Sequence, residues 1–209
     1  MVASSDTMVF NSPSVIAALK SKHPSAPLDR RNYPIVNPAG ASVSVAAAQV
    51  SKAVLSFPAG SAGGPDGLSP QHVKDVIRVE GPTGVLALRL SDFTNTVLSG
   101  AIPYDVKPLF FGARLFAFQK KDGGIRPIAV GLSLRRLVGK CLCHIVTPLF
   151  WLQAGHLQLG VGTKRGLEAG VYAARGFLRQ LPLTHAMIKI DFANAFNTLW
   201  RDVICVRGP

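Results

Sequence analysis

The chain has 209 residues with 23 Lys and Arg against 11 Asp and Glu, a formal net charge of +12, and 48% hydrophobic residues. This composition predicts a folded globular chain with ample apolar material for a core, and it excludes a low-complexity or disordered protein. Basic residues interrupt every long apolar stretch, at Arg89, Lys107, Lys140 and the Lys164–Arg165 pair, so we expect no membrane span.

Four helices are predicted in the first hundred residues. Serine caps, proline at the first helical position and glycine after the last one mark their ends. Ser42 or Ser44 caps the second helix, and the loop Phe57–Ser69 after it is rich in Gly and Pro throughout. The expected helices cover residues 12–21, the second cap to about 57, 69–80 and 83–99.

The hydrophobic pattern then changes to the period of strands. Ala113–Gln119 and Ile125–Val130 are β-type runs, and the segment Lys120–Gly124 between them contains Asp-Gly, a strong hairpin signal. The sequence therefore predicts a hairpin with a basic tip and an α+β fold. Farther on we expect a helix over about 133–153 that Pro148 could break, a helix over 164–180 and a strand over 185–191.

Most of the positive charge lies in the second half of the chain. Residues 1–106 hold 8 bases and 7 acids, whereas residues 107–209 hold 15 bases and 4 acids. Such an excess attracts a polyanion, and nucleic-acid backbones are the commonest polyanions inside cells. An anionic membrane is the rival partner, but the bases are spread among apolar segments and form no polybasic stretch. We therefore expect nucleic acid as a partner and no membrane.

The three cysteines are an odd number, and Cys141 and Cys143 are two positions apart, where helical side chains diverge. We interpret them, with Cys205, as reduced thiols of an intracellular protein, with no indication of nucleus or cytoplasm. A metal site made of Cys141, Cys143 and His144 is a minor alternative, because the usual zinc spacing is missing.

Asp191 ends a short apolar run, and the aromatic Phe196 follows five positions later. A buried acid at a strand end is costly unless a cation meets it. Mg²⁺ is the natural candidate, because it prefers carboxylate oxygen and completes its shell with water and substrate phosphates. The plainer alternative is that Asp191 caps the following turn.

Lys120, Lys121 and Arg126 flank the turn of the predicted hairpin, and Arg126 stands directly before Pro127 in an apolar strand. A rigid β-ribbon can hold these cations over a nearby site, which would suit a triphosphate. The alternative is a solvated hairpin with ordinary exposed lysines at its tip.

Two glycine-rich stretches, Gly60–Gly67 and Gly160–Gly166, lack the residues that complete a phosphate loop or a dinucleotide fingerprint. Both are interpreted as tight turns, although either would let backbone amides approach a phosphate.

Four motifs, in this order, resemble the first half of a reverse transcriptase domain, most closely those of retrotransposons without long terminal repeats. The resemblance covers about residues 42–205. The motifs are Ser61–Leu68; Leu115–Gly131 with Arg135, Arg136, Leu137 and Lys140; Gln158–Gly160 with Gly166–Glu168; and Ile190–Phe196. The fold that the resemblance implies is the fingers and partial palm of a right-hand polymerase, with an N-terminal extension (1–41), a fingers-like region (42–180) and the start of a truncated palm (181–209).

The resemblance also implies roles for individual residues. Asp191 matches the first metal-binding aspartate of the palm, with the carbonyl of Phe192 as a further ligand for Mg²⁺ or Mn²⁺. Phe196 matches the aromatic residue under the sugar of the incoming nucleotide, which excludes a 2′-hydroxyl. Lys120 and Arg126 match the fingers residues that hold the triphosphate, and Lys121 stands beside them.

The turn of Gly64, Pro65, Asp66 and Gly67 matches a segment near the template path. The implied partners are an RNA template, a DNA primer and a deoxynucleoside triphosphate, and the implied chemistry is in-line attack by the primer 3′-hydroxyl with two metal ions. The resemblance indicates no oligomeric state.

Two departures from the family pattern matter. Asn197 stands where many relatives have Asp, and the family's second catalytic element, an aromatic residue followed by Ala-Asp-Asp, is absent from the 209 residues. One carboxylate cannot hold two metals in line, so we expect this polypeptide not to polymerise alone. The strand 185–191 would normally pair with the absent element, so we expect its edge and apolar face to be exposed.

The alternative to a polymerase fragment is a non-catalytic remnant of a retroelement that still binds nucleic acid through its basic half. The charge alone favours the remnant, whereas the spacing of Asp191 and Phe196 favours polymerase ancestry.

Overall fold

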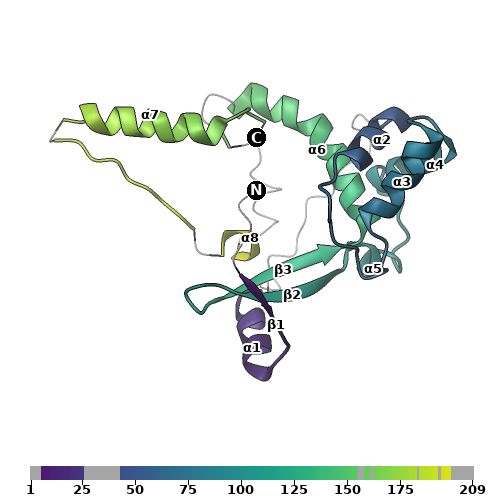
Figure 1. Ribbon diagram of the computed structural model, residues 1–209, viewed down its shortest axis with the longest axis horizontal. Coiled ribbons are helices and arrows are strands. Elements are labelled where there is room, and N and C mark those ends of the chain that lie inside the picture. Colours follow the sequence, from purple (N-terminus) through teal and green to yellow (C-terminus); the bar gives the residue numbers. More distant parts are fainter. Residues whose placement is uncertain are drawn as a thin grey trace. The chain divides into compact units, whose positions relative to one another are not determined.

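Helices α1 to α8 and a three-stranded antiparallel sheet make up a mixed α+β structure in the computed structural model (Figure 1). The structure describes residues 6–25, 43–154, 158–160, 162–182, 184–192 and 194–198. Two compact units divide the chain, Met1–Leu137 with Phe192–Pro209 and Val138–Asp191, and each is considered by itself.

Helices α2 (Ala47–Leu55), α3 (Pro70–Glu80) and α4 (Val85–Leu98) pack against one another in the first unit. Their apolar faces form its main core, in which the least exposed side chains are Val50, Ala53, Val54, Ile77 and Ala87. Apolar spacing of three and four residues along each helix produces these faces.

The segment before α2 is tied to α4 by polar groups. The amide of Val45 donates to Asn95 Oδ1 at 2.8 Å, and Ser91 Oγ donates to the Val45 carbonyl at 2.7 Å. The helix cap differs from the prediction: Ala46 is the N-cap and its amide donates to Gln49 Oε1 at 2.7 Å, so the cap acceptor comes from the third helical residue. Ser44 caps nothing, and Ser42 lies outside the described residues.

The predicted hairpin is confirmed almost residue for residue, as β2 (Ala113–Gln119) and β3 (Ile125–Gly131). The turn is closed by the amide of Lys120, which donates to the Gly124 carbonyl at 2.8 Å, and Gly123 takes φ 79° there. A left-handed backbone of this kind favours glycine, which explains the strength of the Asp-Gly signal.

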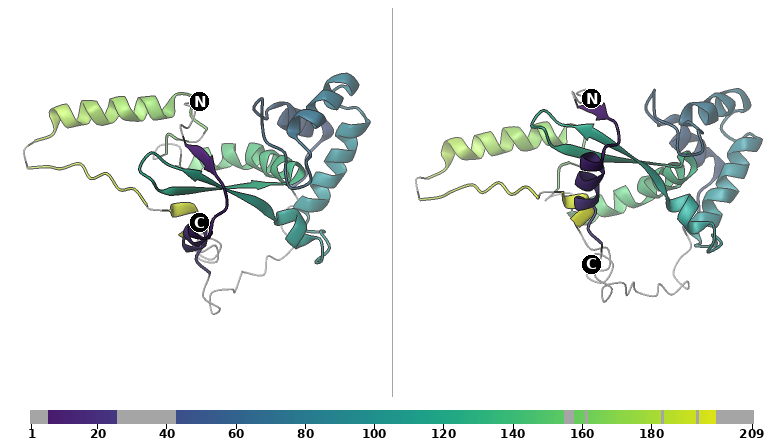
Figure 2. Two further views of the ribbon diagram at one scale, coloured as in Figure 1. Left: turned by 60° about the horizontal axis from the view of Figure 1, so that its bottom comes forward. Right: turned by 90° about the horizontal axis from the view of Figure 1, so that it is seen from below.

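A third strand, β1 (Thr7–Val9), pairs antiparallel with β2 and was not predicted (Figure 2). Three residues are too few to show an alternating pattern. The helix α1 (Pro13–Ser21) follows it, with Ser12 Oγ accepting from the Val15 amide at 3.3 Å as the sequence predicts. Residues of the expected N-terminal extension thus complete the sheet.

The short helix α5 (Lys107–Phe111) was also missed. It has five residues and no polar cap, so its signal is weak. Phe110 is buried and meets the Phe93 ring edge to face, with 5.8 Å between ring centroids. This aromatic pair attaches α5 to α4.

Helix α6 (Ser133–Ala154) begins in the first unit and continues into the second, and α7 (Gly166–Gln180) follows in the second unit. Pro148 removes one backbone hydrogen bond but α6 continues through it, so the considered break does not occur. Trp151 Nε1 donates to Thr163 Oγ1 at 2.9 Å and ties the end of α6 to the turn before α7.

Within the described ranges, α6 is the one helix long and apolar enough to cross a bilayer, by length and composition alone. Only 17% of its most apolar stretch is buried, so core packing does not account for that composition. A single helix of this kind is weak evidence for a membrane, and the absence of a membrane partner stays a prediction.

The expected strand over 185–191 is wrong. Residues 184–192 adopt neither helix nor strand, and no described segment pairs with them. A strand needs a hydrogen-bonded neighbour, and an apolar alternating run does not supply one. The expected exposure is found, since the exposed fractions of Ile188, Ile190 and Phe192 are 82%, 73% and 76%.

Gly64 and Gly139 make a matched pair for stability. A Cβ at Gly64 would lie 2.7 Å from Leu132 Cα, whereas a Cβ at Gly139, inside α6, meets nothing within 4 Å. We expect Gly64→Ala to lower the free energy of unfolding by about 1–3 kcal/mol through overpacking. Gly139→Ala should raise it by about 0.5–1 kcal/mol through the lower backbone entropy of the unfolded chain. Urea denaturation followed by circular dichroism measures both, and a Gly64→Ala protein as stable as the wild type would contradict the close packing.

Candidate nucleic-acid interface

The tip of the hairpin carries the two predicted lysines on an ordered turn. Lys121 is exposed and Lys120 is half-buried. Asp122 Oδ1 accepts from the Gly124 amide at 3.0 Å, so the one acid of the tip is engaged in forming the turn. The backbone of the tip is therefore fixed, while the Lys121 ammonium faces solvent and can meet an anion.

Arg126 forms an ion pair with another residue of the chain, Asp6. Its Nη1 lies 2.8 Å from Asp6 Oδ2, and the exposed fractions of the two side chains are 47% and 9%. Asp6 directly precedes β1, so the unpredicted strand brings a carboxylate to a predicted triphosphate ligand. In the predicted triphosphate role, Arg126 would already be partly engaged by Asp6.

The glycine-rich loop lies against the base of the hairpin. The Gly67 amide donates to the Gly64 carbonyl at 3.0 Å, and the Leu68 amide donates to Asp66 Oδ1 at 3.2 Å. Gly67 has φ 75°, which confirms the tight turn. Ser133 Oγ donates to the Leu68 carbonyl at 2.5 Å, so the loop is fixed to the first residue of α6.

The predicted template turn and the predicted triphosphate lysines therefore belong to opposite ends of the hairpin. Seven residues of β2 separate the two ends, which corresponds to about 20 Å at the usual strand rise. The structure brings the Gly64–Gly67 turn to the base of β3 and not to Lys120 and Lys121.

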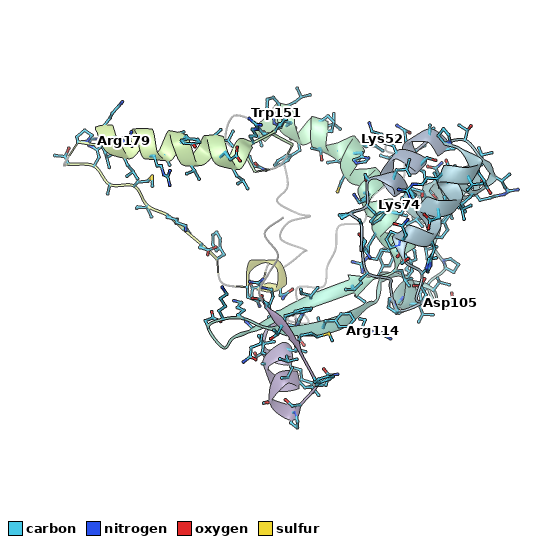
Figure 3. The ribbon with its side chains drawn as sticks, viewed as in Figure 1. Lys52, Lys74, Asp105, Arg114, Trp151 and Arg179 are labelled. Atoms are coloured by element: carbon cyan, nitrogen blue, oxygen red, sulfur yellow. The ribbon has the colours of Figure 1, made fainter. Side chains whose placement is uncertain are left out.

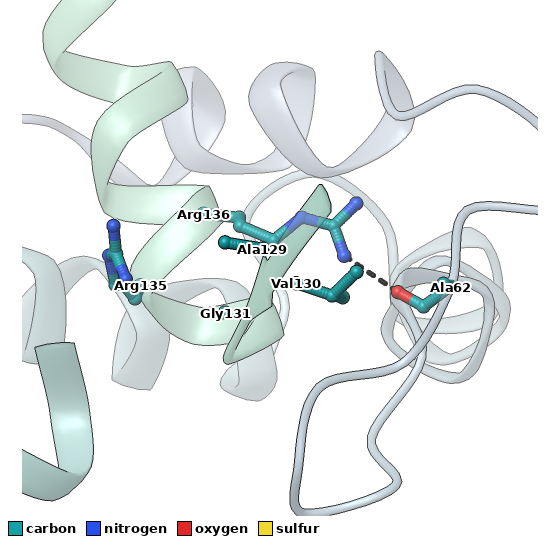
Figure 4. A pocket seen from close by; sticks show the side chains of 6 residues that line it. All are labelled: Ala62, Ala129, Val130, Gly131, Arg135 and Arg136. Atoms are coloured by element: carbon teal, nitrogen blue, oxygen red, sulfur yellow. Dashed lines mark hydrogen bonds between the residues drawn. The ribbon is translucent and has the colours of Figure 1, made fainter. Parts of the chain in front are cut away.

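Arg135 and Arg136 of the second motif lie at the base of the hairpin, and the sequence predicts no role for them. Arg135 and Arg136 line a hollow of about 280 Å³ with Ala62, Ala129, Val130 and Gly131 (Figure 4). Arg136 Nη1 donates to the Ala62 carbonyl at 2.6 Å, and Arg135 Nη1 donates to the Phe111 carbonyl at 2.7 Å. Their sequence signal is the Arg-Arg pair itself; the contacts that hold them come from segments more than twenty residues away.

Phe57 interacts with two cationic side chains, one through its ring and one through its carbonyl. The guanidinium carbon of Arg136 lies 5.3 Å from the centre of its ring. From inside the helical body, the buried Lys74 of α3 donates to the Phe57 carbonyl (Figure 3). This carbonyl follows the end of α2, where a cation is favourable. Lys74 is therefore a buried structural residue.

The predicted metal ligand Asp191 is exposed and is the last residue of the second unit, while Phe192 belongs to the first. The hairpin belongs to the first unit and Asp191 to the second, so these two parts of the predicted site are considered separately. Phe196 lies in the short helix α8 (Ala195–Thr198), and its side chain is outside the description.

The turn before α8 is held by asparagines. Asn194 takes φ 54°, and its Nδ2 donates to the Lys22 carbonyl at 2.8 Å. Asn197 Nδ2 donates to Asn194 Oδ1 at 3.1 Å, a bond that an aspartate could not donate. The departure from the family pattern at Asn197 thus has a local structural use.

The part of the chain that the structure describes contains no group of three or more His, Cys, Asp and Glu side chains able to hold a metal ion. A site made of Cys141, Cys143 and His144 is therefore wrong. Burial raises the pKa of the Cys141 thiol, and the positive charge of Lys140 opposes this rise. A thiol kept protonated in this way is a poor metal ligand.

Asp191 and the Phe192 carbonyl offer two oxygen donors. Mg²⁺ commonly binds through one or two carboxylates together with substrate phosphates. These donors alone are too few to hold a free ion, and the metal-binding role of Asp191 and Phe192 stays a prediction.

No family model matches the chain, and neither the curated proteins nor the solved structures contain a match to it.

The Asp6–Arg126 pair gives a prediction. Asp6→Asn removes the carboxylate that competes for Arg126, so the affinity of the chain for a deoxynucleoside triphosphate should rise by about two- to fivefold, the scale of a partly exposed ion pair. Isothermal titration at low salt measures this affinity.

Asp92→Asn is the matched control. It removes an equal charge from the exposed Arg89–Asp92 pair of α4, where the charged atoms lie 3.6 Å apart. Equal affinities for the two variants would show that Asp6 does not restrain Arg126 against phosphates.

Proposed function

We propose that the chain is part of a template-directed nucleotidyltransferase of the reverse transcriptase type, from a retrotransposon without long terminal repeats. One observation carries the proposal: two of the four motifs, which are far apart in sequence, meet in one body. The loop 61–68, the base of the β2–β3 hairpin and the start of α6 are joined by the Ser133–Leu68 and Arg136–Ala62 hydrogen bonds. Gly64 approaches Leu132 so closely that no side chain fits between them.

In this proposal the fingers-like part handles phosphates. Lys120, Lys121 and Arg126 bind the triphosphate of an incoming nucleotide, and the Gly64–Gly67 turn runs beside an RNA template paired with a DNA primer. Support comes from the fixed basic tip and from the net charge of residues 107–209, which hold 15 bases and 4 acids.

Asp191 and the Phe192 carbonyl bind Mg²⁺ or Mn²⁺ together with nucleotide phosphates, and Phe196 selects the deoxyribose. The metal would neutralise phosphate charge when bound. The 209 residues contain no aromatic-Ala-Asp-Asp element, so we expect this polypeptide not to polymerise alone.

A non-catalytic module that binds nucleic acid is the second candidate. The exposure of Asp191 and the lack of a metal-binding group among the described residues favour it. The two candidates agree on nucleic-acid binding and differ on metal-dependent nucleotide binding.

Asp191→Asn separates the candidates. If Asp191 contacts a nucleotide-borne metal, the Mg²⁺-dependent affinity for a deoxynucleoside triphosphate should fall by about tenfold or more, the scale of one lost charge-assisted contact. Asp105→Asn, at another exposed carboxylate, controls for the change of charge (Figure 3). Titration of a fluorescent deoxynucleoside triphosphate with and without Mg²⁺ reads the difference.

An affinity that is independent of Mg²⁺ and equal in both variants would favour the binding module. Template-dependent primer extension by the purified chain, with Mg²⁺ or Mn²⁺, would contradict the expected inactivity.

A further inference from the structure

The hollow at the base of the hairpin has the chemistry of an anion site. Of its six lining residues, Arg135 and Arg136 are cationic and none is acidic. Both guanidinium groups come from the first turns of α6, and Figure 4 shows the Arg136 group reaching toward Ala62 across the end of β3. The Arg135 group lies on the other side of the start of α6, so the two positive charges border the hollow from different sides (Figure 4).

Both guanidinium groups are held in place by carbonyls. Arg135 Nη1 contacts the Phe111 carbonyl at 2.7 Å and the Gly112 carbonyl at 3.5 Å, and Arg136 Nη1 contacts the Ala62 carbonyl at 2.6 Å. A guanidinium has five N–H groups, so each arginine keeps donors beyond those used here. Carbonyl contacts position the groups without neutralising their charge, in contrast to Arg126, which has Asp6.

Gly131 and Asp66 shape the surroundings of the hollow. A Cβ at Gly131 would lie 3.0 Å from Arg135 Nη1, so glycine permits the close approach of this side chain to β3. The acid nearest in the loop, Asp66, accepts from the Leu68 amide at 3.2 Å and shapes the turn. With a volume of about 280 Å³, the hollow has room for a tetrahedral oxyanion and part of what carries it.

We propose that this hollow binds a phosphate group of a nucleic acid or nucleotide through Arg135 and Arg136. It would be a second phosphate contact, about 20 Å from the hairpin tip along β2 and β3. The inference rests on the phosphate handling in the proposed function, but it requires neither Asp191 nor a metal.

Ala129 supplies the sharpest test, because it lines the hollow, is exposed and lies on β3, the edge strand of the sheet. Ala129→Glu places a carboxylate beside the two arginines, and Ala129→Gln places a side chain of equal size without charge. Ala129 takes no part in the hydrogen bonds that hold the arginines. Fluorescence anisotropy of a labelled single-stranded RNA, and of a labelled deoxynucleoside triphosphate, measures binding to the full chain.

We expect Ala129→Glu to bind one of these probes about three- to tenfold more weakly than Ala129→Gln, the effect of one opposing charge in a partly solvated site. If the loss is confined to RNA, the site holds a strand phosphate, and the slope of log affinity against log salt should fall by about 0.7. A loss confined to the triphosphate identifies a nucleotide phosphate.

Arg135→Gln should weaken binding of the same probe, whereas Arg89→Gln, which removes an equal charge from an exposed position of α4, should not. Equal binding of both probes by Ala129→Glu and Ala129→Gln overturns the phosphate site. The proposed function would survive that result if Asp191→Asn still removed the Mg²⁺-dependent nucleotide affinity, so the two failures are distinguishable.

Discussion

The close contact between the glycine-rich loop and the β3–α6 junction organises the first unit. Gly64 can approach Leu132 because it has no side chain, and Ser133 Oγ then donates to the Leu68 carbonyl at 2.5 Å. This contact connects the hairpin to the helical body beside the hollow that Arg135 and Arg136 line. A larger residue at position 64 would push the loop away from the β3–α6 junction, because the clash is with backbone and not with a movable side chain.

Local chemistry made most of the fold predictable. The hairpin bounds follow from period-two runs around an Asp-Gly turn that needs a left-handed residue, which is Gly123. Helix ends follow from proline and glycine positions, as at Pro70 and Gly81. The failures involve pairing at long range: β1 is a strand only because β2 lies beside it, and the apolar run that ends at Asp191 is not a strand because no described segment does.

The candidate site was predictable only in part for the same reason. Lys120 and Lys121 stand at a turn that the sequence marks, so their place at an exposed tip could be expected. The partner of Arg126 could not, because Asp6 lies in a distant segment with no pattern of its own. Likewise, an Arg-Arg pair on a helix is ordinary until the fold brings carbonyls and an empty volume to it.

The ion pair between Asp6, just before β1, and Arg126 of the hairpin couples the pairing of β1 with the sheet to anion binding at Arg126. If Arg126 binds an anion as proposed, that anion weakens the attraction to Asp6, which helps hold the three-residue strand β1 to the sheet. Thermodynamic linkage makes the effect mutual, so tighter seating of the strand must weaken anion capture by the same factor. Under the proposed function, the amino-terminal segment and the nucleotide would therefore compete for one guanidinium.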